Sequence, residues 1–546
     1  MKGLSTSIFL RVAGAVMSAV LLALCFPPFD VPWVVWIGLV PLLAVLWADP
    51  KSPGGRGGFG WGYLCGFVFF SINLKWLHAN EFVPPVGVVV LHAYLAIYFG
   101  VFGAFAGTVG RWRRGDGGKG FFAASWPAIR SAFLCAAAWT GLEWARGYIF
   151  TGFGWNGLGV SFHDELAMAQ AADVVGVSGL AFAVVFFNVV IYATVVRLAD
   201  ELREGRPRPH FDFMTAVVLV ALQFLYGVKE LTRPVPEEVT ELRTLIVQGN
   251  IPQGQKWDPD KVHENYRVYD DLTRLNMESA EFDLVIWPES ALYFPLFHGM
   301  NFHKEVMNPL LAMQDISLIT GVNEDALDEG DFNAMAIFYG DVETFEVYRK
   351  VHLVPFGEFI PGRDWFPPAR WLAERVMRFE FDAGTETEPL PLANSKVEVI
   401  PMICFEDTVG RLMRKFVREA PQLMVNVTND GWFGETEAAA QHLANAKFRC
   451  IELRRPMVRS TNNGVSAVID EIGSLYHRGA ELAAGERVIS DPETGATFIR
   501  GFMADTIAVP NAPRTPVYAK VGDVFAVGCL VVAMGGAIVG WWKRRA

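Results

Sequence analysis

Long apolar runs, separated by short charged connections, fill the first 230 residues of the chain. Each run is long enough, or nearly so, for a helix to cross a bilayer core of about 30 Å. An eighth run, "VFAVGCLVVAMGGAIVGWW", lies near the C-terminus. The pattern therefore predicts eight transmembrane helices, at residues 8–26, 31–48, 58–77, 86–110, 131–150, 168–196, 211–228 and 524–542.

Positively charged residues gather in alternate connections, and they predict the orientation of these spans. They follow the second, fourth, sixth and eighth spans, while the other connections carry only stray charges such as Lys75. The residues concerned are Lys51, Arg56, Arg111, Arg113, Arg114, Lys119, Arg197, Arg203, Arg206, Arg208, Lys543, Arg544 and Arg545. By the positive-inside rule, both termini are cytoplasmic. Residues 230–520 then lie across the membrane, which we interpret as a bacterial inner membrane with this region in the periplasm.

From about residue 243 the chain shows short runs rich in β-branched residues that end in turn-forming residues, as strands do. Apolar residues at three- and four-residue spacing predict helices within 260–280 and 438–456. Strands mixed with helices predict one layered α/β domain. We expect a seven-helix domain over 1–230, the α/β domain over 240–510 and a last transmembrane helix within 520–546. The predicted strands are "RTLIVQGNI", "FDLVIWPES", "ISLITGVNE", "NAMAIFYG", "TFEVYRK", "VEVIPMICFED", "QLMVNVTND" and "MVRSTNNGVSAVID".

The composition agrees with a membrane protein. The 546 residues are 52% hydrophobic and only 19% charged, with a mean hydropathy of +0.27, whereas a soluble chain of this length needs more charge on its surface. The net charge of −11 argues against a nucleic-acid partner, which would require a basic face. The six cysteines show neither a disulfide framework nor the paired CxxC spacing of a metal site.

Three polar residues stand at the ends of predicted strands, where the catalytic groups of α/β domains concentrate. Glu289 ends "LVIWPES", Lys350 ends "FEVYRK" and Cys404 ends "VIPMIC". A thiol needs a base or a nearby cation to become a nucleophile. Glu289 can take the proton, and Lys350 can stabilise the thiolate and a later oxyanion, with the backbone N–H of Phe405 as a second donor. Taken singly, each residue type is more often structural at such a position, and a buried cysteine is usually a small hydrophobe.

These residues lie in motifs that resemble known families. "WPES", "YRKVHLVPFGEFIP" and "ICFED", in this order, resemble the Glu–Lys–Cys triad of the nitrilase superfamily. This resemblance implies a nitrilase-like αββα sandwich for the α/β domain. The motifs that resemble apolipoprotein N-acyltransferases more specifically are "VQGNIPQGQKW", "HLVPFGEFIP", "NVTNDGWFG", "AQHLANAKFRCIELRRPMVRSTNNGVSAV" and "EWARGYIFTGFGW". Soluble nitrilases lack the eight spans, and the resemblance that covers both halves of the chain is to the apolipoprotein N-acyltransferases.

The second resemblance implies an activity. That family moves an acyl chain from a phospholipid, chiefly phosphatidylethanolamine, to the α-amine of the diacylglyceryl cysteine that begins a maturing lipoprotein, as the last maturation step. Cys404 would carry the acyl chain as a thioester in a ping-pong reaction, assisted by Glu289 and Lys350. No metal and no soluble cofactor are expected. The implied partners are the phospholipid donor, the apolipoprotein acceptor and the bilayer, and we expect a monomer.

Supporting residues also follow from the resemblance. Glu358 matches a glutamate that supports Lys350 or relays protons, and Glu406 matches a second family glutamate. Trp257 matches an aromatic residue implicated in substrate handling. The alternatives are a surface charge for Glu358, a helix N-terminal carboxylate for Glu406 and a packing indole for Trp257. Phe405 stands where relatives commonly carry Tyr, which excludes any role for a phenolic hydroxyl at this position.

Other features leave alternatives open. The aromatic segments 290–302 and 364–381 are too apolar for ordinary exposed loops. We expect lids that dip into the outer leaflet, the alternative being core crossings. Glu143 and Arg146 at the end of the fifth span form either a functional pair or a structural ion pair. Two rival functions are a membrane-tethered amidase that uses the same triad with water, and a transporter with an inactive sensor domain.

Overall fold

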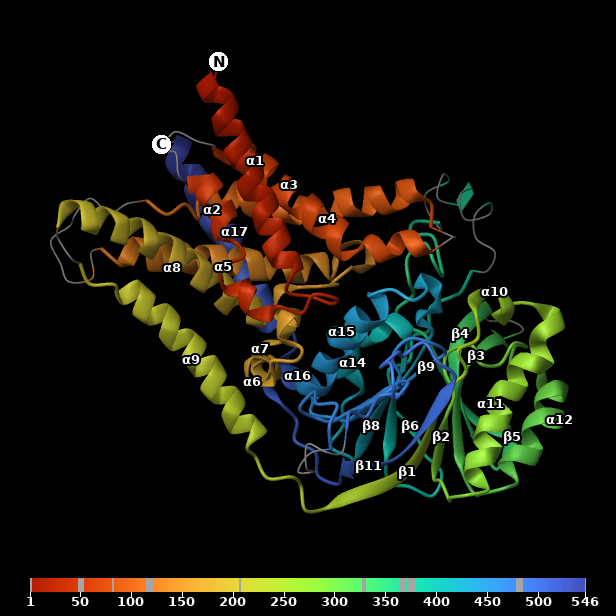
Figure 1. Ribbon diagram of the computed structural model, residues 1–546. Coiled ribbons are helices and arrows are strands. Elements are labelled where there is room, and N and C mark those ends of the chain that lie inside the picture. The colour runs from red at the N-terminus through yellow and green to blue at the C-terminus, as the bar shows by residue number, and fades with distance from the viewer. Residues whose placement is uncertain are drawn as a thin grey trace. The chain divides into compact units, whose positions relative to one another are not determined.

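The protein is described from a computed structural model. It describes residues 2–47, 54–80, 83–113, 122, 124–205, 208–326, 330–363, 367, 370, 371, 375, 380–477 and 485–545. The chain divides into two compact units, Met1–Arg233 with Val521–Ala546, and Pro234–Lys520 (Figure 1). The predicted charges at Lys51, Arg114, Lys119 and Arg206 lie outside the described residues.

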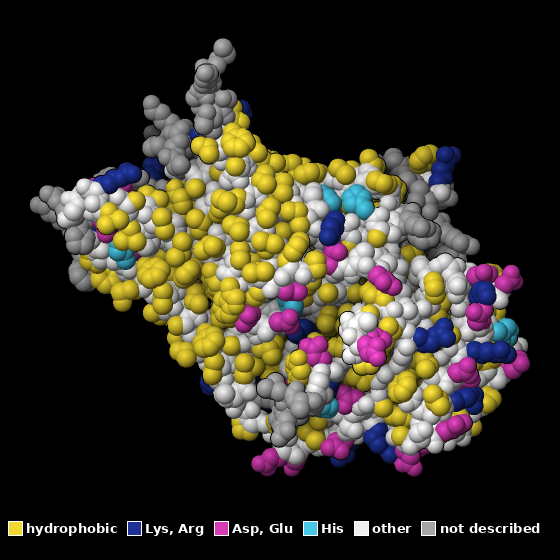
Figure 2. All heavy atoms as spheres, in the orientation of Figure 1, with side chains coloured by type: hydrophobic (Ala, Val, Ile, Leu, Met, Phe, Trp, Pro, Cys, Tyr) yellow, Lys and Arg dark blue, Asp and Glu magenta, His cyan; other side chains and the backbone are white. Residues whose placement is uncertain are grey.

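The first unit is built from apolar helices. Among the described residues, four helical segments are long and apolar enough to cross a membrane: Pro85–Ala106, Val177–Glu204, Phe211–Leu231 and Val524–Lys543. Large apolar side chains stay exposed on this unit, and hydrophobic side chains gather over it in the face shown in Figure 2. Such a surface fits a lipid environment better than water. The helices are α1 (Lys2–Ala23), α2 (Val40–Trp47), α3 (Gly54–Asn73), α4 (Pro85–Ala106), α5 (Trp126–Arg146), α6 (Leu166–Ala169), α7 (Ala172–Val175), α8 (Val177–Glu204), α9 (Phe211–Leu231) and α17 (Val524–Arg545).

Helices occur in all eight predicted intervals, but two intervals are not single helices. The interval 31–48 contains a 3-10 turn, Pro32–Trp36, and then the eight-residue α2, which is only about 12 Å long at 1.5 Å per residue. Pro41 lacks the N–H that a continuous helix would direct at the carbonyl of Ile37. The interval 168–196 breaks at Gly176, whose φ of +72° leaves the right-handed helical region.

Glycines allow α3 and α4 to pack with their backbones in contact. A Cβ atom added to Gly62 would lie 2.2 Å from the carbonyl oxygen of Phe99, and one added to Gly58 would lie 2.4 Å from that of Gly103. Both distances are far shorter than a van der Waals contact. Small residues at such positions let van der Waals packing hold apolar helices together without a hydrophobic driving force.

The second unit contains two sheets, as the layered α/β prediction requires. Strands β11-β1-β2-β3-β4-β5 form a six-stranded sheet, and β10-β9-β8-β7-β6 form a five-stranded one. The sheets contact each other through β1 and β9 and through β4 and β7. The strands are β1 (Val239–Gln248), β2 (Leu284–Ile286), β3 (Ser317–Ala326), β4 (Gly330–Tyr339), β5 (Asp341–Arg349), β6 (Leu390–Pro391), β7 (Glu398–Ile403), β8 (Gln422–Thr428), β9 (Met457–Thr461), β10 (Ala467–Ile469) and β11 (Gly501–Pro510).

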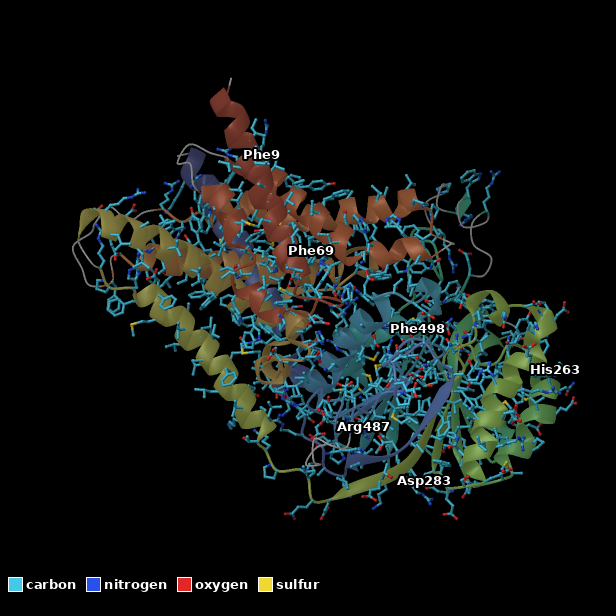
Figure 3. The ribbon with its side chains drawn as sticks, viewed as in Figure 1. Phe9, Phe69, His263, Asp283, Arg487 and Phe498 are labelled. Carbon is cyan, nitrogen blue, oxygen red and sulfur yellow. The ribbon has the colours of Figure 1, made fainter. Side chains whose placement is uncertain are left out.

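Helices cover the sheets. Helices α11 (Val262–Met277) and α12 (Met300–Leu311) contact β1 and β5 of the six-stranded sheet, and α15 (Ala438–Leu453) shares a buried cluster with β10. Strands β1, β2 and β3 are parallel, and two antiparallel pairings bring β5 back into the same direction. The C-terminal ends of β2 and β5 therefore lie at one edge of this sheet. Asp283, labelled in Figure 3, marks the opposite end of β2, where it pairs with Arg243 on the surface.

One predicted lid is buried in part. Within 290–302, Leu292 and Leu296 are buried in the same cluster as the sheet residues Leu245 and Val285, and α12 starts at Met300. The lid prediction is therefore wrong for these leucines, because burial against the sheet removes more apolar surface from water than exposure would. The other predicted lid, 364–381, lies largely outside the described residues.

The glycine contact between α3 and α4 leads to a stability prediction. Gly62→Leu places a side chain where the carbonyl oxygen of Phe99 lies, so we expect overpacking that costs about 1–3 kcal/mol. The thermal unfolding midpoint of the purified protein in detergent should fall by several degrees. Gly60→Leu on the same helix is the control, because an added Cβ there has nothing within 4 Å. Equal midpoints for the two variants would contradict the close packing.

Candidate active site

The ends of three strands bring Glu289, Lys350 and Cys404 together in the second unit. Glu289 follows β2, Lys350 directly follows β5 and Cys404 directly follows β7. Glu289 and Lys350 are buried, with 6% and 1% of their surface exposed, while Cys404 is half-buried. The structure therefore places the three predicted residues at one site, with the thiol as the most accessible of them.

Glu289 has the features of a proton acceptor. Its Oε1 accepts a hydrogen bond from Asn333 Nδ2 at 2.9 Å and lies 3.8 Å from Lys350 Nζ. Its Oε2 is buried, and none of the described residues donates a hydrogen bond to it. Burial raises the pKa of Glu289, and the charge of Lys350 opposes that rise. One carboxylate oxygen is thus fixed and the other is left available for a proton.

Lys350 is held as an ammonium group by Glu358. Lys350 Nζ donates to Glu358 Oε1 at 2.8 Å, and Asn333 Nδ2 donates to the same oxygen at 2.8 Å. The other oxygen of Glu358 accepts from the backbone N–H of Val354 at 2.8 Å. Burial alone would lower the pKa of Lys350, but the charges of Glu358, of the Cys404 thiolate and of Glu289 outweigh burial and raise it. Glu358 is therefore an ion-pair partner and not a surface charge.

Cys404 sits on a strained turn. Its φ is +51°, a left-handed conformation that is rare and costly for a residue with a Cβ. Asn426 on β8 secures the turn by donating to the carbonyl of Cys404 at 3.2 Å and to Asp407 at 2.6 Å. Burial and the charge of Glu289 raise the pKa of the Cys404 thiol, while Lys350 opposes this rise. The thiol is therefore neutral at rest and needs a base to become a nucleophile.

Glu406 ties two of these strand ends together. Its Oε1 accepts hydrogen bonds from Tyr348 and from the backbone N–H groups of Val351 and His352, each at 2.9 Å. Its Oε2 accepts from the backbone N–H of Ile403 at 2.9 Å. Burial raises the pKa of Glu406 to about 7. Glu406 is a carboxylate in the first turn of the 3-10 helix Cys404–Thr408, as the alternative describes, and its Oε1 also fixes the chain after Lys350.

The remaining predicted residues lie around this group. Phe405 is buried and stacks on His352, with ring centroids 5.9 Å apart. Burial, with the charges of Arg411 and Lys350, lowers the pKa of His352 to about 4, so this ring is neutral. Trp257 is half-buried and follows α10 (Gln253–Lys256).

The sequence analysis did not single out two polar residues at this site. Lys256, next to Trp257, donates from Nζ to the backbone carbonyl of Glu289 at 2.7 Å. Asn333 joins the carboxylates of Glu289 and Glu358. Lys256 stands in the quoted motif "VQGNIPQGQKW" and Asn333 begins the predicted strand "NAMAIFYG". A polar residue at a strand end was therefore the available signal for Asn333.

A second buried charge network lies behind Cys404, and it was also missed. His442 on α15 contacts Asp430 at 2.8 Å and Asp407 at 2.9 Å. Arg459 on β9 pairs with Asp407 and lies 3.1 Å from Asp430. Such buried charges persist only when paired, because each carries a desolvation cost of several kcal/mol. The network fixes the turn that follows the cysteine.

The geometry provides a base, a cation and a thiol, which is sufficient for nucleophilic acyl transfer. Among the described residues, no group of three or more His, Cys, Asp or Glu side chains is arranged to hold a metal ion. The side chains at the site can supply proton transfer, thiolate attack and oxyanion stabilisation.

Comparison with known proteins covers both units. A family model for the apolipoprotein N-acyltransferase N-terminal domain matches residues 18–190, and one for carbon-nitrogen hydrolase matches residues 246–489. A solved carbon-nitrogen hydrolase from Helicobacter pylori is 13% identical, with a TM-score of 0.34, and covers 49% of this chain and 89% of its own.

Relatives match the chain over most of its length. A protein of Geobacter metallireducens named apolipoprotein N-acyltransferase is 30% identical and covers 96% of this chain and 94% of its own. One of the same name from Nitrosomonas europaea is 31% identical and covers 80% of this chain and 82% of its own. These matches confirm the resemblance found in the motifs. The chain belongs to the apolipoprotein N-acyltransferase family.

Proposed function

We propose that this acyltransferase moves a fatty acyl chain from a phospholipid, chiefly phosphatidylethanolamine, to the α-amine of the diacylglyceryl cysteine of an apolipoprotein. The supporting observation is that Glu289, Lys350 and Cys404 lie at one site in a chain whose relatives are named apolipoprotein N-acyltransferase. The rival function is that of an amidase, which would use the same three residues with water as the acceptor. Apolar helices in the same chain favour a lipid substrate.

The first half of the reaction acylates Cys404. Glu289 takes the thiol proton while the sulfur attacks the ester carbonyl of the phospholipid. The resulting oxyanion is stabilised by Lys350 and by the backbone N–H of Phe405. When the C–O bond breaks, the proton on Glu289 passes to the leaving oxygen, and lysophospholipid departs. The acyl chain stays on sulfur as a thioester.

The second half transfers the acyl chain to nitrogen. Glu289, again unprotonated, takes a proton from the incoming α-amine, which attacks the thioester. The same donors stabilise the second oxyanion, and the C–S bond then breaks to leave an amide. The proton on Glu289 returns to the sulfur, which restores the resting enzyme. Every step is a proton or acyl transfer, so no electron acceptor or metal is required.

Three residues support this chemistry. Glu358 keeps Lys350 charged and aimed at the site through its 2.8 Å ion pair. Glu406 holds the strand ends that carry Lys350 and Cys404. Trp257 contributes an aromatic surface for substrate next to the carbonyl contact of Lys256.

The same proposal includes a membrane topology. The first unit, which includes the last helix, supplies eight spans in the bacterial inner membrane, and the catalytic unit faces the periplasm. The positive charges in alternate connections support this orientation. Lipoprotein acceptors that have crossed the membrane would then meet the catalytic unit on the side where they are anchored. We propose a monomer as the working form.

The acyl-enzyme can be tested directly. Protein incubated with phospholipid alone should gain the mass of one fatty acyl group, released by neutral hydroxylamine, because the first half-reaction needs no acceptor. Cys404→Ala should gain none, while Cys450→Ala should label like the parent, since Cys450 is fully buried in α15. Adding a diacylated lipopeptide should move the label to its α-amine. A label on Cys450, or rapid turnover in water alone, would favour the amidase function instead.

Lys350→Met tests the oxyanion role. Removing this donor should slow lysophospholipid release about a hundredfold or more, while far-UV circular dichroism stays unchanged. Lys396→Met, an exposed lysine before β7, is the matched control and should behave like the parent. Near-parent turnover of folded Lys350→Met would show that the assignment of Lys350 is wrong.

The topology predicts opposite locations for two parts of the chain. Reporter fusions that end near residue 205 should be active only in the cytoplasm, because arginines precede this point. Fusions that end near residue 400 should be active only in the periplasm. Fusions at both points that report the same side would contradict the proposed orientation.

A further inference from the structure

Lys256 is a second buried lysine at the site, outside the Glu–Lys–Cys group. It ends the short helix α10 and has 5% of its surface exposed. Its Nζ donates a hydrogen bond to the backbone carbonyl of Glu289 at 2.7 Å. A buried ammonium group is costly unless its charge is compensated. The buried ammonium group of Lys256 therefore requires negative charge nearby.

The charged groups that act on Lys256 are those of the reaction. Burial lowers the pKa of Lys256 to about 8, and Glu289 and the Cys404 thiolate act in the opposite direction. Phenols from two other elements, Tyr266 and Tyr269 of α11 and Tyr293 of the connection before α12, line the same small pocket. Burial raises the pKa values of Tyr266 and Tyr269 well above 10, so these phenols stay neutral.

The turn that carries Glu289 needs the support that Lys256 gives. Ser290, the next residue, has a φ of +48°, in the left-handed region. The backbone of Glu289 also lies against Gly321, where an added Cβ would be 2.5 Å from the Glu289 Cα. Glu289 lies beyond the end of β2. Its backbone carbonyl accepts a hydrogen bond from Lys256, in place of the strand-to-strand hydrogen bond that it would accept inside a sheet. Lys256 thus fixes the residue whose carboxylate must face Cys404.

We propose that Lys256 is a positioning residue of the acyl-transfer site: its ammonium group holds the turn that carries Glu289 and stabilises the negative charge that passes between Glu289 and Cys404. Lys350 interacts with the carboxylate side chain, while Lys256 interacts with the backbone of the same residue. The phospholipid substrate in this role rests on the proposed function. The effect of Lys256 on the Cys404 thiol does not rest on it.

The role predicts the sign of a pH dependence. Only protonated Lys256 carries the stabilising charge, so the first half-reaction should slow as pH rises through about 8. Acyl-enzyme formation is the appropriate measurement, because the α-amine of the acceptor, which also titrates near pH 8, is then absent. A guanidinium group stays protonated throughout this range. Lys256→Arg should therefore shift the alkaline decline to higher pH.

The experiment compares the full-length parent with Lys256→Met, Lys256→Arg and Lys261→Met in detergent. Two rates are measured for each: acyl-enzyme formation from phospholipid between pH 6 and 10, and alkylation of Cys404 by iodoacetamide at pH 7, mapped by peptide mass. Lys261→Met is the matched control, because Lys261 is a half-buried lysine five residues later, and its side chain forms its ion pair with the exposed Glu264. Thermal unfolding verifies that each variant is folded.

Cys404 in Lys256→Met should be alkylated about tenfold more slowly than in the parent, which is the effect of one pKa unit on the thiolate population. The rate of acyl-enzyme formation in this variant should show no decline near pH 8. Cys404 should be alkylated within a few-fold of the parent rate in Lys256→Arg and at the parent rate in Lys261→Met. Parent-like alkylation and an unshifted pH profile in folded Lys256→Met would overturn the proposal. If the parent forms no acyl-enzyme, the phospholipid function is refuted. The alkylation rates still decide the role of Lys256 in that case, because alkylation requires no lipid.

Discussion

The site depends on one buried carboxylate, that of Glu406. Lys350 follows β5, which belongs to the six-stranded sheet, and Cys404 follows β7, which belongs to the five-stranded sheet. No ladder of backbone hydrogen bonds joins these two strands in the described chain. Glu406 supplies that link, because one of its oxygens accepts from the chain just after Lys350 and the other from the residue just before Cys404. Charge-assisted bonds of this kind are short and directional, so Glu406 joins the two strand ends directly, while Asn426 holds the turn of Cys404 and Glu358 holds Lys350.

The charges around the thiol are nearly balanced, and this balance decides where the proton rests. Two carboxylates, Glu289 and Glu358, face two ammonium groups, Lys350 and Lys256, in a region that is almost closed to water. Deprotonating Cys404 would add an uncompensated negative charge, and its pKa is accordingly raised. A neutral thiol next to Glu289 fits the proposed transfer of its proton to that carboxylate. In this proposal the proton moves during attack, and no preformed thiolate is needed.

Local sequence patterns predicted the strand ends of the site. They did not predict the features that depend on contacts between residues far apart in the chain. Strand ends after "LVIWPES", "FEVYRK" and "VIPMIC" could be located from β-branched runs, and the structure brings Glu289, Lys350 and Cys404 to one site. Strand β11 was not predicted, because its pairing partner β1 lies some 260 residues earlier in the chain. Lys256 and Asn333 were missed for the same reason, since their partners are set by tertiary packing. In the segment 290–302 the alternative of a core crossing holds for Leu292 and Leu296, and the sequence could not decide this because apolar loops and core crossings have the same composition.

A hydrolase and an acyltransferase can share this site, because both pass through an acyl-thiol and differ only in the acceptor. In the proposed reaction the acceptor must reach Cys404, which is half-buried, whereas Glu289 and Lys350 are almost fully buried. The residue after Cys404, Phe405, is buried and stacks on His352, whose ring is neutral. Rings of this kind gain more from contact with a lipid chain than from contact with water. The proposed preference for an amine anchored to lipid over water therefore rests on the surroundings of Cys404, because the catalytic groups themselves would serve either acceptor.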